Sequence, residues 1–368
     1  MDGPRPPRPD ETDDLEDLAA LCFGFPRPAS RSRRRSAPRR SLGGRVIVAD
    51  GRPIAHVHIV YNRLSIYGAL VKIASFGGVC THPDYRGRGL ASQLLAHCLR
   101  EVRDAGAALV LISGTRGLYR RTGAVPAGPV WHANVQAEAL RRPRRSVSVR
   151  RAEHCDWPAI ASLHHAEPVR FLRTGEFFSR LLPPDSHRNI WLAEMDGKPL
   201  AYLCLSHMWG IPNRDRVRAL GEYAGARATV LAALPLLLRA AELGGIRLSV
   251  PQFDQELTYL LRAQGHQLRA GTMPDHTIRL VNLPGLMKAL RPYLRAHLSA
   301  SELRRLDCEQ ADDTFRFALS DHRAEMGVSE AGRLLFDGKR IPRISGDLHR
   351  ALSLLTPIPI PLPGLNYV

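Results

Sequence analysis

The chain has 368 residues, of which 44% are hydrophobic and 24% are charged, and it carries a formal net charge of +17 with a pI near 10.4. This length exceeds one ordinary domain core, so we expect two or three domains, and the composition excludes a disordered chain. The charge excludes an acidic protein and would attract polyanions such as nucleic acid, an acidic lipid surface or a phosphorylated cofactor.

Six cysteines are scattered singly, with no Cys-x-x-Cys pair. We therefore expect no metal site and no disulfide framework. The longest apolar run, at 228–238, has 11 residues with a proline inside, so we expect no membrane span. The N-terminus lacks a signal pattern, and these features together predict a cytoplasmic protein.

The first elements in chain order are a helix and a hairpin. Residues 10–25 have apolar positions at helical spacing, and residues 26–40 are rich in proline, serine and arginine, which is typical of a loop. The apolar runs at 46–49 and 54–60 flank the turn dipeptide Asp50-Gly51, which predicts a hairpin. A further strand is expected at about 71–81.

A glycine-bearing turn follows that strand, with the sequence Arg86-Gly87-Arg88-Gly89-Leu90-Ala91, and helical apolar spacing begins at Leu90. Bare backbone N–H groups and the dipole of the following helix form a natural anion site, and a pyrophosphate is its natural occupant. Arg86 and Arg88 could add charge-assisted hydrogen bonds to phosphate oxygens. The pattern fits neither a P-loop nor a dinucleotide fingerprint. An ordinary glycine-rich connection is the alternative.

The helix is expected to end at Gly106, and the continuous apolar run at 107–112 is typical of a central strand covered on both faces. The order of helix, hairpin, strand, glycine turn, helix and strand predicts an α/β layer with a mixed sheet flanked by helices.

A weak internal repeat then appears. Residues 50–55, Asp-Gly-Arg-Pro-Ile-Ala, recur 146 residues later as Asp-Gly-Lys-Pro-Leu-Ala at 196–201, each time between strand-like runs. A helical stretch at 227–243 and a strand-like run at 246–250 follow, as in the first half. We therefore predict a tandem duplication, with domains at 1–145 and 146–274. Residues 275–368 repeat neither half, open with a strand and a helix, and are predicted to form a small α+β domain.

The segment from Val79 to Ala91 closely resembles the acetyl-CoA motif of GCN5-related N-acetyltransferases. The resemblance implies acetyl-CoA as co-substrate, with its pyrophosphate on the turn and its pantetheine arm against the backbone of Val79 and Thr81, between which Cys80 lies. Ser113 could hydrogen-bond the cofactor, although a loop-capping serine is the commoner explanation.

Residues 118–124, Leu-Tyr-Arg-Arg-Thr-Gly-Ala, resemble a second segment of this family, whose tyrosine usually lies near the cofactor sulfur. An amine that attacks a thioester expels a thiolate, which a phenol can protonate. The resemblance therefore implies Tyr119 as general acid, and a tyrosine that packs in the core is the alternative.

The general base is left open. Residues 72–81 contain no acid where the family usually has one, so His56, His58 and His82 are candidates. The whole architecture resembles the enhanced-intracellular-survival acetyltransferases, whose last domain is like a sterol carrier protein and whose C-terminal carboxylate acts as base. That group here belongs to Val368; a merely packed or frayed chain end is the alternative.

The second half lacks the residues that the first half has for binding a cofactor. Residues 222–227, Glu-Tyr-Ala-Gly-Ala-Arg, stand in place of the phosphate turn, with one glycine and an acid that would repel phosphate, and Leu261 stands opposite Tyr119. We expect this half to shape the substrate cleft.

The leading hypothesis is acetyl transfer from acetyl-CoA to a small-molecule or peptide amine, by direct attack in a ternary complex. The resemblance points to polyamine-like antibiotics such as aminoglycosides, yet a protein of charge +17 would repel a polycation, so a protein N-terminus, a lysine or a small amine stays open. The alternative is a basic acyl-CoA-sensing regulatory or nucleic-acid-binding protein, suggested by eight arginines and no acid between Arg27 and Arg45. Assembly into a homo-oligomer is left open.

Overall fold

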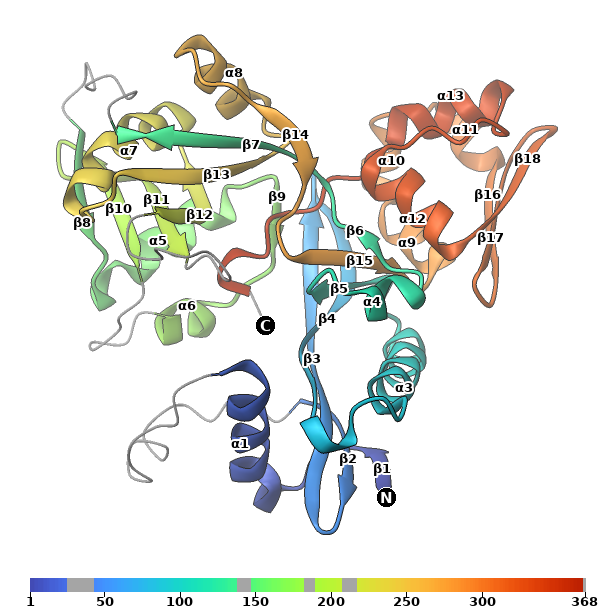
Figure 1. Ribbon diagram of the computed structural model, residues 1–368. Helices are drawn as coiled ribbons and strands as arrows, with labels where there is room; N and C mark the ends of the chain where they lie inside the picture. The colour runs from blue at the N-terminus through green and yellow to red at the C-terminus, as the bar shows by residue number, and fades with distance from the viewer. Residues whose placement is uncertain (25–42, 138–146, 182–188, 207–216, 367–368) are drawn as a thin grey trace.

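The computed structural model describes residues 1–24, 43–137, 147–181, 189–206 and 217–366. They form three sheets with helices packed against them, and the first sheet lies between the other two (Figure 1). None of the described helices combines the length and the apolar character needed to cross a bilayer.

The first sheet is mixed and contains the predicted hairpin and the strand that follows it. Its strands, in order across the sheet, are β1 (Asp2–Arg5), β2 (Gly44–Ala49), β3 (Arg52–Ile66), β4 (Ala69–Thr81), β5 (Leu109–Ser113), β15 (His276–Leu280) and β6 (Val125–Pro126), with β9 (Val169–Phe171) added along β3. The helices of this unit are α1 (Thr12–Phe23), α3 (Leu90–Asp104) and α4 (Gly117–Arg121), with short 3-10 turns η1 (Pro9–Glu11) and η2 (Pro83–Tyr85).

The second sheet has the same arrangement. Its strands, in order, are β8 (Val147–Arg151), β10 (Ile190–Met195), β11 (Lys198–Ser206), β12 (Val217–Gly225), β13 (Gly245–Pro251), β7 (Pro129–Gln136) and β14 (Arg269–Thr272). Its helices are α5 (Trp157–His165), α6 (Gly175–Leu181), α7 (Arg227–Ala240) and α8 (Gln255–Ala263), with the turn η4 (His154–Asp156).

The two sheets match strand for strand in direction. β4 and β5 are the one parallel pair along the first path, β12 and β13 are the one parallel pair along the second, and all other neighbours on these described paths are antiparallel. The repeated hairpin turns also match, since Asp50 and Gly51 have φ of 49° and 76° and Asp196 and Gly197 have φ of 51° and 73°. Aspartate and glycine tolerate this left-handed region, which explains why the Asp-Gly signal recurs.

The predicted domain limits do not match the sheets at three strands. β7 lies before residue 145 yet pairs with β13 and β14 of the second sheet, while β9 lies within 146–274 yet pairs with β3 of the first. β15 lies after residue 274 and also pairs with the first sheet, at β5. Strands are thus exchanged across the predicted limits. Alternation in the sequence indicates a strand but says nothing of its partner, so the exchange was not predictable from the pattern.

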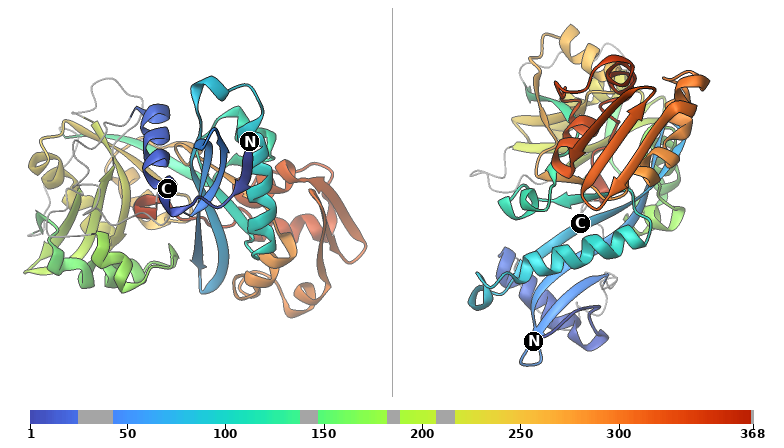
Figure 2. Two further views of the ribbon diagram at one scale, coloured as in Figure 1. Left: turned by 90° about the horizontal axis from the view of Figure 1, so that it is seen from below. Right: turned by 90° about the vertical axis from the view of Figure 1, so that its right-hand side faces the viewer.

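The third unit is a three-stranded antiparallel sheet, seen in the right-hand view of Figure 2, with helices against one side. Its elements are α9 (Leu283–Ala289), α10 (Arg291–Arg295), α11 (Ala300–Arg305), β16 (Leu306–Ala311), β17 (Thr314–Leu319), β18 (His322–Gly327), α12 (Val328–Asp337) and α13 (Gly346–Leu355). This unit is α+β as predicted, while its likeness to a sterol carrier protein stays a prediction.

The first sheet is buried on both sides. One side packs against α3, through the residues predicted for that face of the helix, Leu90, Leu94, Leu95, Cys98, Leu99 and Val102. A second apolar cluster joins Leu64, Ile73 and Leu109 of the sheet to Phe315 and Phe317 of the third unit. This double cover explains the continuous apolar character of β5.

Candidate active site

β4 and β5 separate at one end. They pair in parallel from Ile73 with Leu109 to Phe76 with Ile112, and β4 then continues for five residues to Thr81. A bulge in the β3–β4 register falls at this same place, where Gly78 has a φ of 57°. The separation leaves the backbone of Val79, Cys80 and Thr81 without a β5 partner, as a site for an extended ligand requires.

The turn between β4 and α3 has the predicted bare backbone. Gly87 and Gly89 have φ of 77° and 76°, a region that glycine occupies without strain. Beyond its chain neighbours, a Cβ built on either would meet no atom of the described residues within 4 Å. Gly89 is the N-cap of α3, no side chain caps this end, and the first turn has no acidic residue. The N–H groups of Leu90 and Ala91 therefore lie at an uncapped, positive helix end that suits a phosphate.

The two arginines of the turn are exposed, and each donates to a carbonyl oxygen. Arg86 Nε donates to Thr81 O at 3.3 Å, and an Arg88 terminal nitrogen donates to Asp84 O at 3.2 Å. Arg88 also lies 4.9 Å above the ring of Tyr85. Both cationic groups remain available to an anion at the helix end.

Tyr119 is buried on α4, with 4% of its surface exposed, and belongs to the same apolar cluster as Val79 and Leu90. A Cβ on Gly114, just beyond β5, would lie 2.7 Å from the Tyr119 ring and 3.5 Å from its hydroxyl oxygen. The φ of Gly114 is 129°. Glycine at this position thus gives the phenol room beside the end of β5, where the strands separate.

Ser113 is the last residue of β5 and pairs with His276 of the exchanged strand β15. Its position at the end of the separated strand is compatible with the predicted cofactor contact, which stays a prediction. The structure brings Val79, Leu90 and Tyr119 together and places Arg86 to Ala91 directly after β4.

A cysteine that the sequence did not single out lies beside this site. Cys22, near the end of α1, donates from Sγ to Thr81 O at 3.4 Å. A hydrogen bond with the buried Cys80 thiol, followed by one with Arg86, lowers the pKa of Cys22 to about 6. The same thiol contact and burial raise the pKa of Cys80. Two thiols at one strand end, one of them partly exposed, were invisible in the sequence because they are 58 residues apart.

We expect Cys22 to react with iodoacetamide with half-maximal rate near pH 6, because alkylation requires the thiolate and its pKa is about 6. The rate should rise from pH 5 and level off by about pH 7, as the thiolate fraction does. Mass-spectrometric mapping of the labelled peptides checks this. Cys22→Ser should remove the fast labelling, and exposed Cys155 provides the internal comparison. Labelling of Cys22 that rises only above pH 8 would contradict the assignment.

The histidine candidates for the base differ in their surroundings. Burial, followed by the charge of His58, lowers the pKa of His56 to about 4, and His56 Nε2 has no hydrogen-bond partner among the described residues. Such a group is a weak base near neutral pH. His82 lies in the turn, where its Nδ1 is 3.7 Å from an Asp84 carboxylate oxygen.

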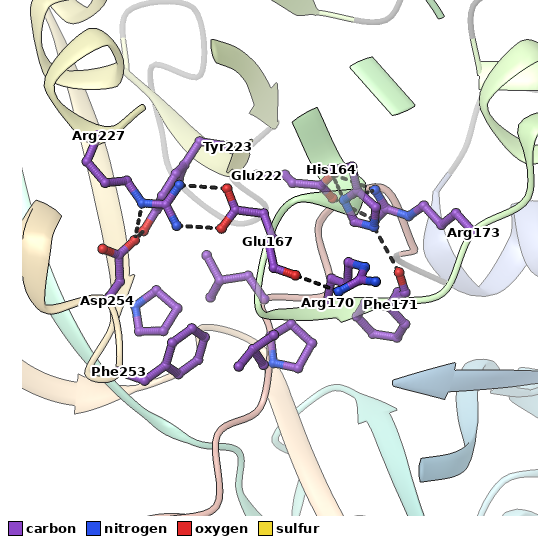
Figure 3. A pocket seen from close by; sticks show the side chains of 14 residues that line it. His164, Glu167, Arg170, Phe171, Arg173, Glu222, Tyr223, Arg227, Phe253 and Asp254 are labelled. Carbon is purple, nitrogen blue, oxygen red and sulfur yellow. Dashed lines mark hydrogen bonds and ion pairs between the residues drawn. The ribbon is translucent and has the colours of Figure 1, made fainter. Parts of the chain in front are cut away.

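In the second half, the carboxylate of Glu167 lies at the start of α7, the element that corresponds to α3 (Figure 3). At the start of α7, the N–H of Gly225 donates to Glu167 Oε1 at 2.9 Å, and Arg227 binds both Glu167 oxygens at 2.7 and 2.6 Å. The cavity beside them measures about 60 Å³, well below the roughly 300 Å³ of a small ligand site. Leu261, opposite Tyr119 in the order of elements, is fully buried on α8. Glu167 thus accepts hydrogen bonds from the backbone N–H and the arginine at the start of α7.

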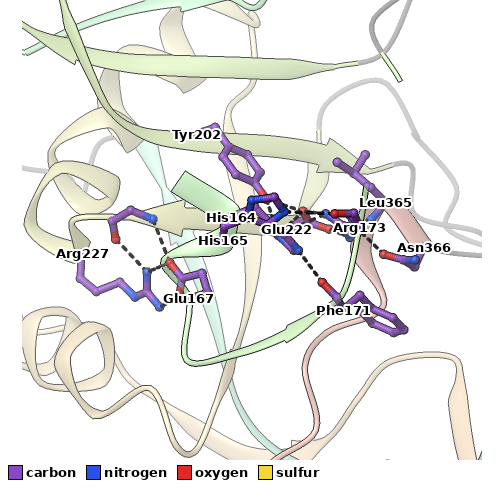
Figure 4. A network of polar contacts seen from close by, with 11 residues as sticks. His164, His165, Glu167, Phe171, Arg173, Tyr202, Glu222, Arg227, Leu365 and Asn366 are labelled. Atoms are coloured by element: carbon purple, nitrogen blue, oxygen red, sulfur yellow. Dashed lines mark hydrogen bonds and ion pairs between the residues drawn. The ribbon is translucent and has the colours of Figure 1, made fainter. Parts of the chain in front are cut away.

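Glu222, interpreted from the sequence as a phosphate-repelling acid, turns away from that place and is buried in a polar network (Figure 4). Arg173 donates to its two carboxylate oxygens at 2.6 and 2.7 Å, and the Tyr202 hydroxyl donates to one of them. The C-terminal segment joins the same network, since Leu365 N donates to Glu222 Oε2 at 2.8 Å. Arg173 was not predicted because no local pattern marks a partner 49 residues away.

Several predicted features lie outside the described residues. Val368, the predicted base, is one of them, as are all arginines of the 27–45 run except Arg45. Arg45 is paired with Glu101. Among the described residues, no group of three or more His, Cys, Asp or Glu side chains could hold a metal ion.

A strand that separates from its parallel neighbour, a glycine turn and an uncapped helix define an α/β domain suited to a phosphorylated ligand. Residues 4–127, which contain all three, match the family model of the acetyltransferase (GNAT) domain. No match was found among curated proteins.

Solved structures share the fold over nearly the whole chain. A probable N-acyltransferase of unknown function from Enterococcus faecalis is 14% identical, with 96% of each chain covered and a TM-score of 0.68. A GCN5-related N-acetyltransferase from Kribbella flavida is 18% identical, with 97% of each chain covered and a TM-score of 0.65. Eis1 from Mycobacterium abscessus is 12% identical over 96% of this chain and 97% of that one, with a TM-score of 0.63. The predicted fold class, a mixed α/β fold with helix-flanked sheets of the GNAT type, is confirmed.

Proposed function

We propose that this protein transfers an acetyl group from acetyl-CoA to a primary amine by direct attack in a ternary complex. The observation that carries the proposal is the uncapped start of α3 at Gly89, reached through a glycine turn inside the segment that matches the acetyltransferase domain. The exposed Arg86 and Arg88 and the bare backbone of the two glycines fit a diphosphate. The separated end of β4 fits an extended pantetheine arm.

The residues divide the chemistry between them. The thioester supplies the activated acyl group, and its C–S bond breaks as the amine nitrogen forms the new C–N bond. Tyr119, on α4 beside Gly114, would donate its phenolic proton to the departing sulfur. The backbone N–H groups of the separated β4 would stabilise negative charge on the carbonyl oxygen. The carboxylate of Val368 would accept the proton that the ammonium must lose, with His56, His58 and His82 as the alternatives.

The architecture of two GNAT units and a sterol-carrier-like third unit is part of the proposal. Its support is the equal strand order of the two sheets, and the Glu167 carboxylate at the start of α7 argues for one cofactor site in the first unit. Residues 1–145, 146–274 and 275–368 remain the proposed units, apart from the exchanged strands β7, β9 and β15.

A thiol-release assay with acetyl-CoA and a panel of amines tests the function. The panel contains aminoglycosides, polyamines, lysine peptides and free peptide N-termini. Release above the rate without amine, with stoichiometric acetylated product, supports the enzyme. Binding of acetyl-CoA without turnover of any amine favours the alternative of an acyl-CoA sensor, and salt-dependent retention on DNA would point to its nucleic-acid-binding form.

A further inference from the structure

Two thiols from distant parts of the chain meet at the end of β4. Cys22 lies in the last turn of α1, which packs against β3 and β4, and Cys80 is the penultimate residue of β4. Their side chains are hydrogen-bonded to each other, and Cys22 Sγ also reaches Thr81 O at 3.4 Å. Both cysteines are free thiols in this structure. Two thiols that the fold holds in contact are the starting geometry for a disulfide.

The two thiols differ in the way that a redox pair requires. Cys22 is partly exposed, and its hydrogen bonds with Cys80 and Arg86 lower its pKa to about 6, so it is mostly thiolate at neutral pH. Cys80 is 6% exposed, and its contact with Cys22, followed by burial, raises its pKa. Oxidants react with an accessible thiolate, and a neighbouring thiol then resolves the product. Cys22 is thus the reactive member of the pair and Cys80 the resolving member.

The pair lies against the backbone that the proposed cofactor needs. Thr81 O accepts from Cys22 Sγ and, at 3.3 Å, from Arg86 Nε, so one carbonyl joins the thiol to the glycine turn. β4 has no β5 partner beyond Phe76, and its register with β3 is interrupted by a bulge. A shift of this strand end would therefore leave the β4–β5 pairs intact.

A disulfide would require such a shift. The S–S bond measures about 2 Å, which is shorter than a hydrogen-bonded contact between two sulfur atoms, so the ends of α1 and β4 must draw together. Thr81 O would also lose its sulfur donor, and Arg86 would lose the thiolate that it contacts. A displacement of about 1 Å near a reacting site can cost as much as 100-fold in rate. Oxidation of the pair should therefore disturb the pantetheine and pyrophosphate contacts together.

We propose that Cys22 and Cys80 form a reversible disulfide that weakens cofactor binding at the end of β4, with a peroxide as the oxidant. The effect on the cofactor rests on the proposed function, whereas formation of the bond does not.

Hydrogen peroxide supplies a balanced route to this bond. The Cys22 thiolate attacks one peroxide oxygen, forms a sulfenic acid and releases hydroxide, which takes up a proton to become water. Cys80 then attacks the Cys22 sulfur, so the S–S bond forms while the S–O bond breaks and a second water leaves. The two thiols lose two electrons in all and the peroxide gains them. A dithiol reductant restores both thiols by exchange.

Peroxide treatment of the full chain, followed by peptide mapping without reductant, tests the bond. We expect a linked pair of peptides that contains Cys22 and Cys80, is lighter by two hydrogen atoms than the separate peptides, and disappears with dithiothreitol. Cys22→Ser should abolish the link, while Cys80→Ser should let Cys22 proceed to sulfinic acid. Cys155→Ser, which removes an exposed cysteine elsewhere, is the matched control and should form the link as the wild type does. Sulfinic acid at Cys22 of the wild type without any link would overturn the pair.

Calorimetric titration with coenzyme A measures the consequence. We expect the oxidised wild type and oxidised Cys155→Ser to bind at least about tenfold more weakly than their reduced forms, with recovery after dithiothreitol. Cys22→Ser keeps a hydroxyl donor for Thr81 O and should show equal affinity before and after peroxide. A complete link with unchanged affinity overturns the control of the site. A reduced protein that binds no coenzyme A overturns the proposed function and this control together, and the mapped link alone then decides whether the disulfide forms.

Discussion

Gly89→Asp will weaken acetyl-CoA binding by at least about 100-fold, equivalent to roughly 2.7 kcal/mol. Gly89 is the N-cap of α3, and its bare backbone borders the space in which the diphosphate would lie. An aspartate there introduces a carboxylate that repels the phosphates and fills that space. Calorimetric titration with coenzyme A measures the effect, and the thiol-release assay should show the same loss.

The fold should tolerate this change, which makes the loss interpretable. Aspartate adopts the left-handed region at modest cost, and its charge favours a helix N-terminus. Gly106→Asp is the matched control, because Gly106 follows the other end of α3, has a φ of 80°, and likewise, beyond its chain neighbours, has no atom of the described residues within 4 Å of a built Cβ. The control should bind coenzyme A as the wild type does. Equal affinity in Gly89→Asp and the wild type would exclude this turn as the pyrophosphate site.

The local parts of the fold could be predicted because their causes are local. A left-handed turn requires residues such as Asp50 and Gly51, and a helix that packs on a sheet requires the apolar spacing that begins at Leu90. The glycine turn belongs to the same class, since the positive φ of Gly87 and Gly89 is a property of the turn itself. These signals placed the candidate site before any tertiary contact was known.

The parts that escaped prediction depend on partners distant in sequence. The strand exchange depends on the sheet edges with which β7 and β15 pair. The alternation of apolar and polar residues within each strand does not indicate which edge that is. Glu222 illustrates a second limit. Its position in the repeat predicted an acid at a phosphate turn. In the structure Glu222 is instead buried beside Arg173 and accepts from the backbone of Leu365, and Glu167 is the acid that binds at the start of α7. The role of a charged residue such as Glu222 can therefore be predicted only when the position of its counter-charge is known.

Tyr119→Phe will lower kcat by about 100-fold or more if this phenol protonates the departing thiolate, within the range usual for a general acid. The substitution keeps the ring, which is 4% exposed in the apolar cluster with Val79 and Leu90, so stability and the KM for acetyl-CoA should change little. Steady-state kinetics with the best amine of the panel, together with a melting curve, measure both effects.

Two comparisons decide whether the hydroxyl acts on the sulfur. Tyr259→Phe removes the same group from an exposed tyrosine of α8 and should leave kcat unchanged. An acetyl thioester that binds the same site but releases a more acidic thiol needs less help from a proton donor, so the penalty of Tyr119→Phe should shrink with it. A penalty of equal size for both thioesters would assign the phenol to packing or orientation, and an undiminished rate would remove Tyr119 from the mechanism. The phenol would then be a core residue that the room beside Gly114 merely accommodates.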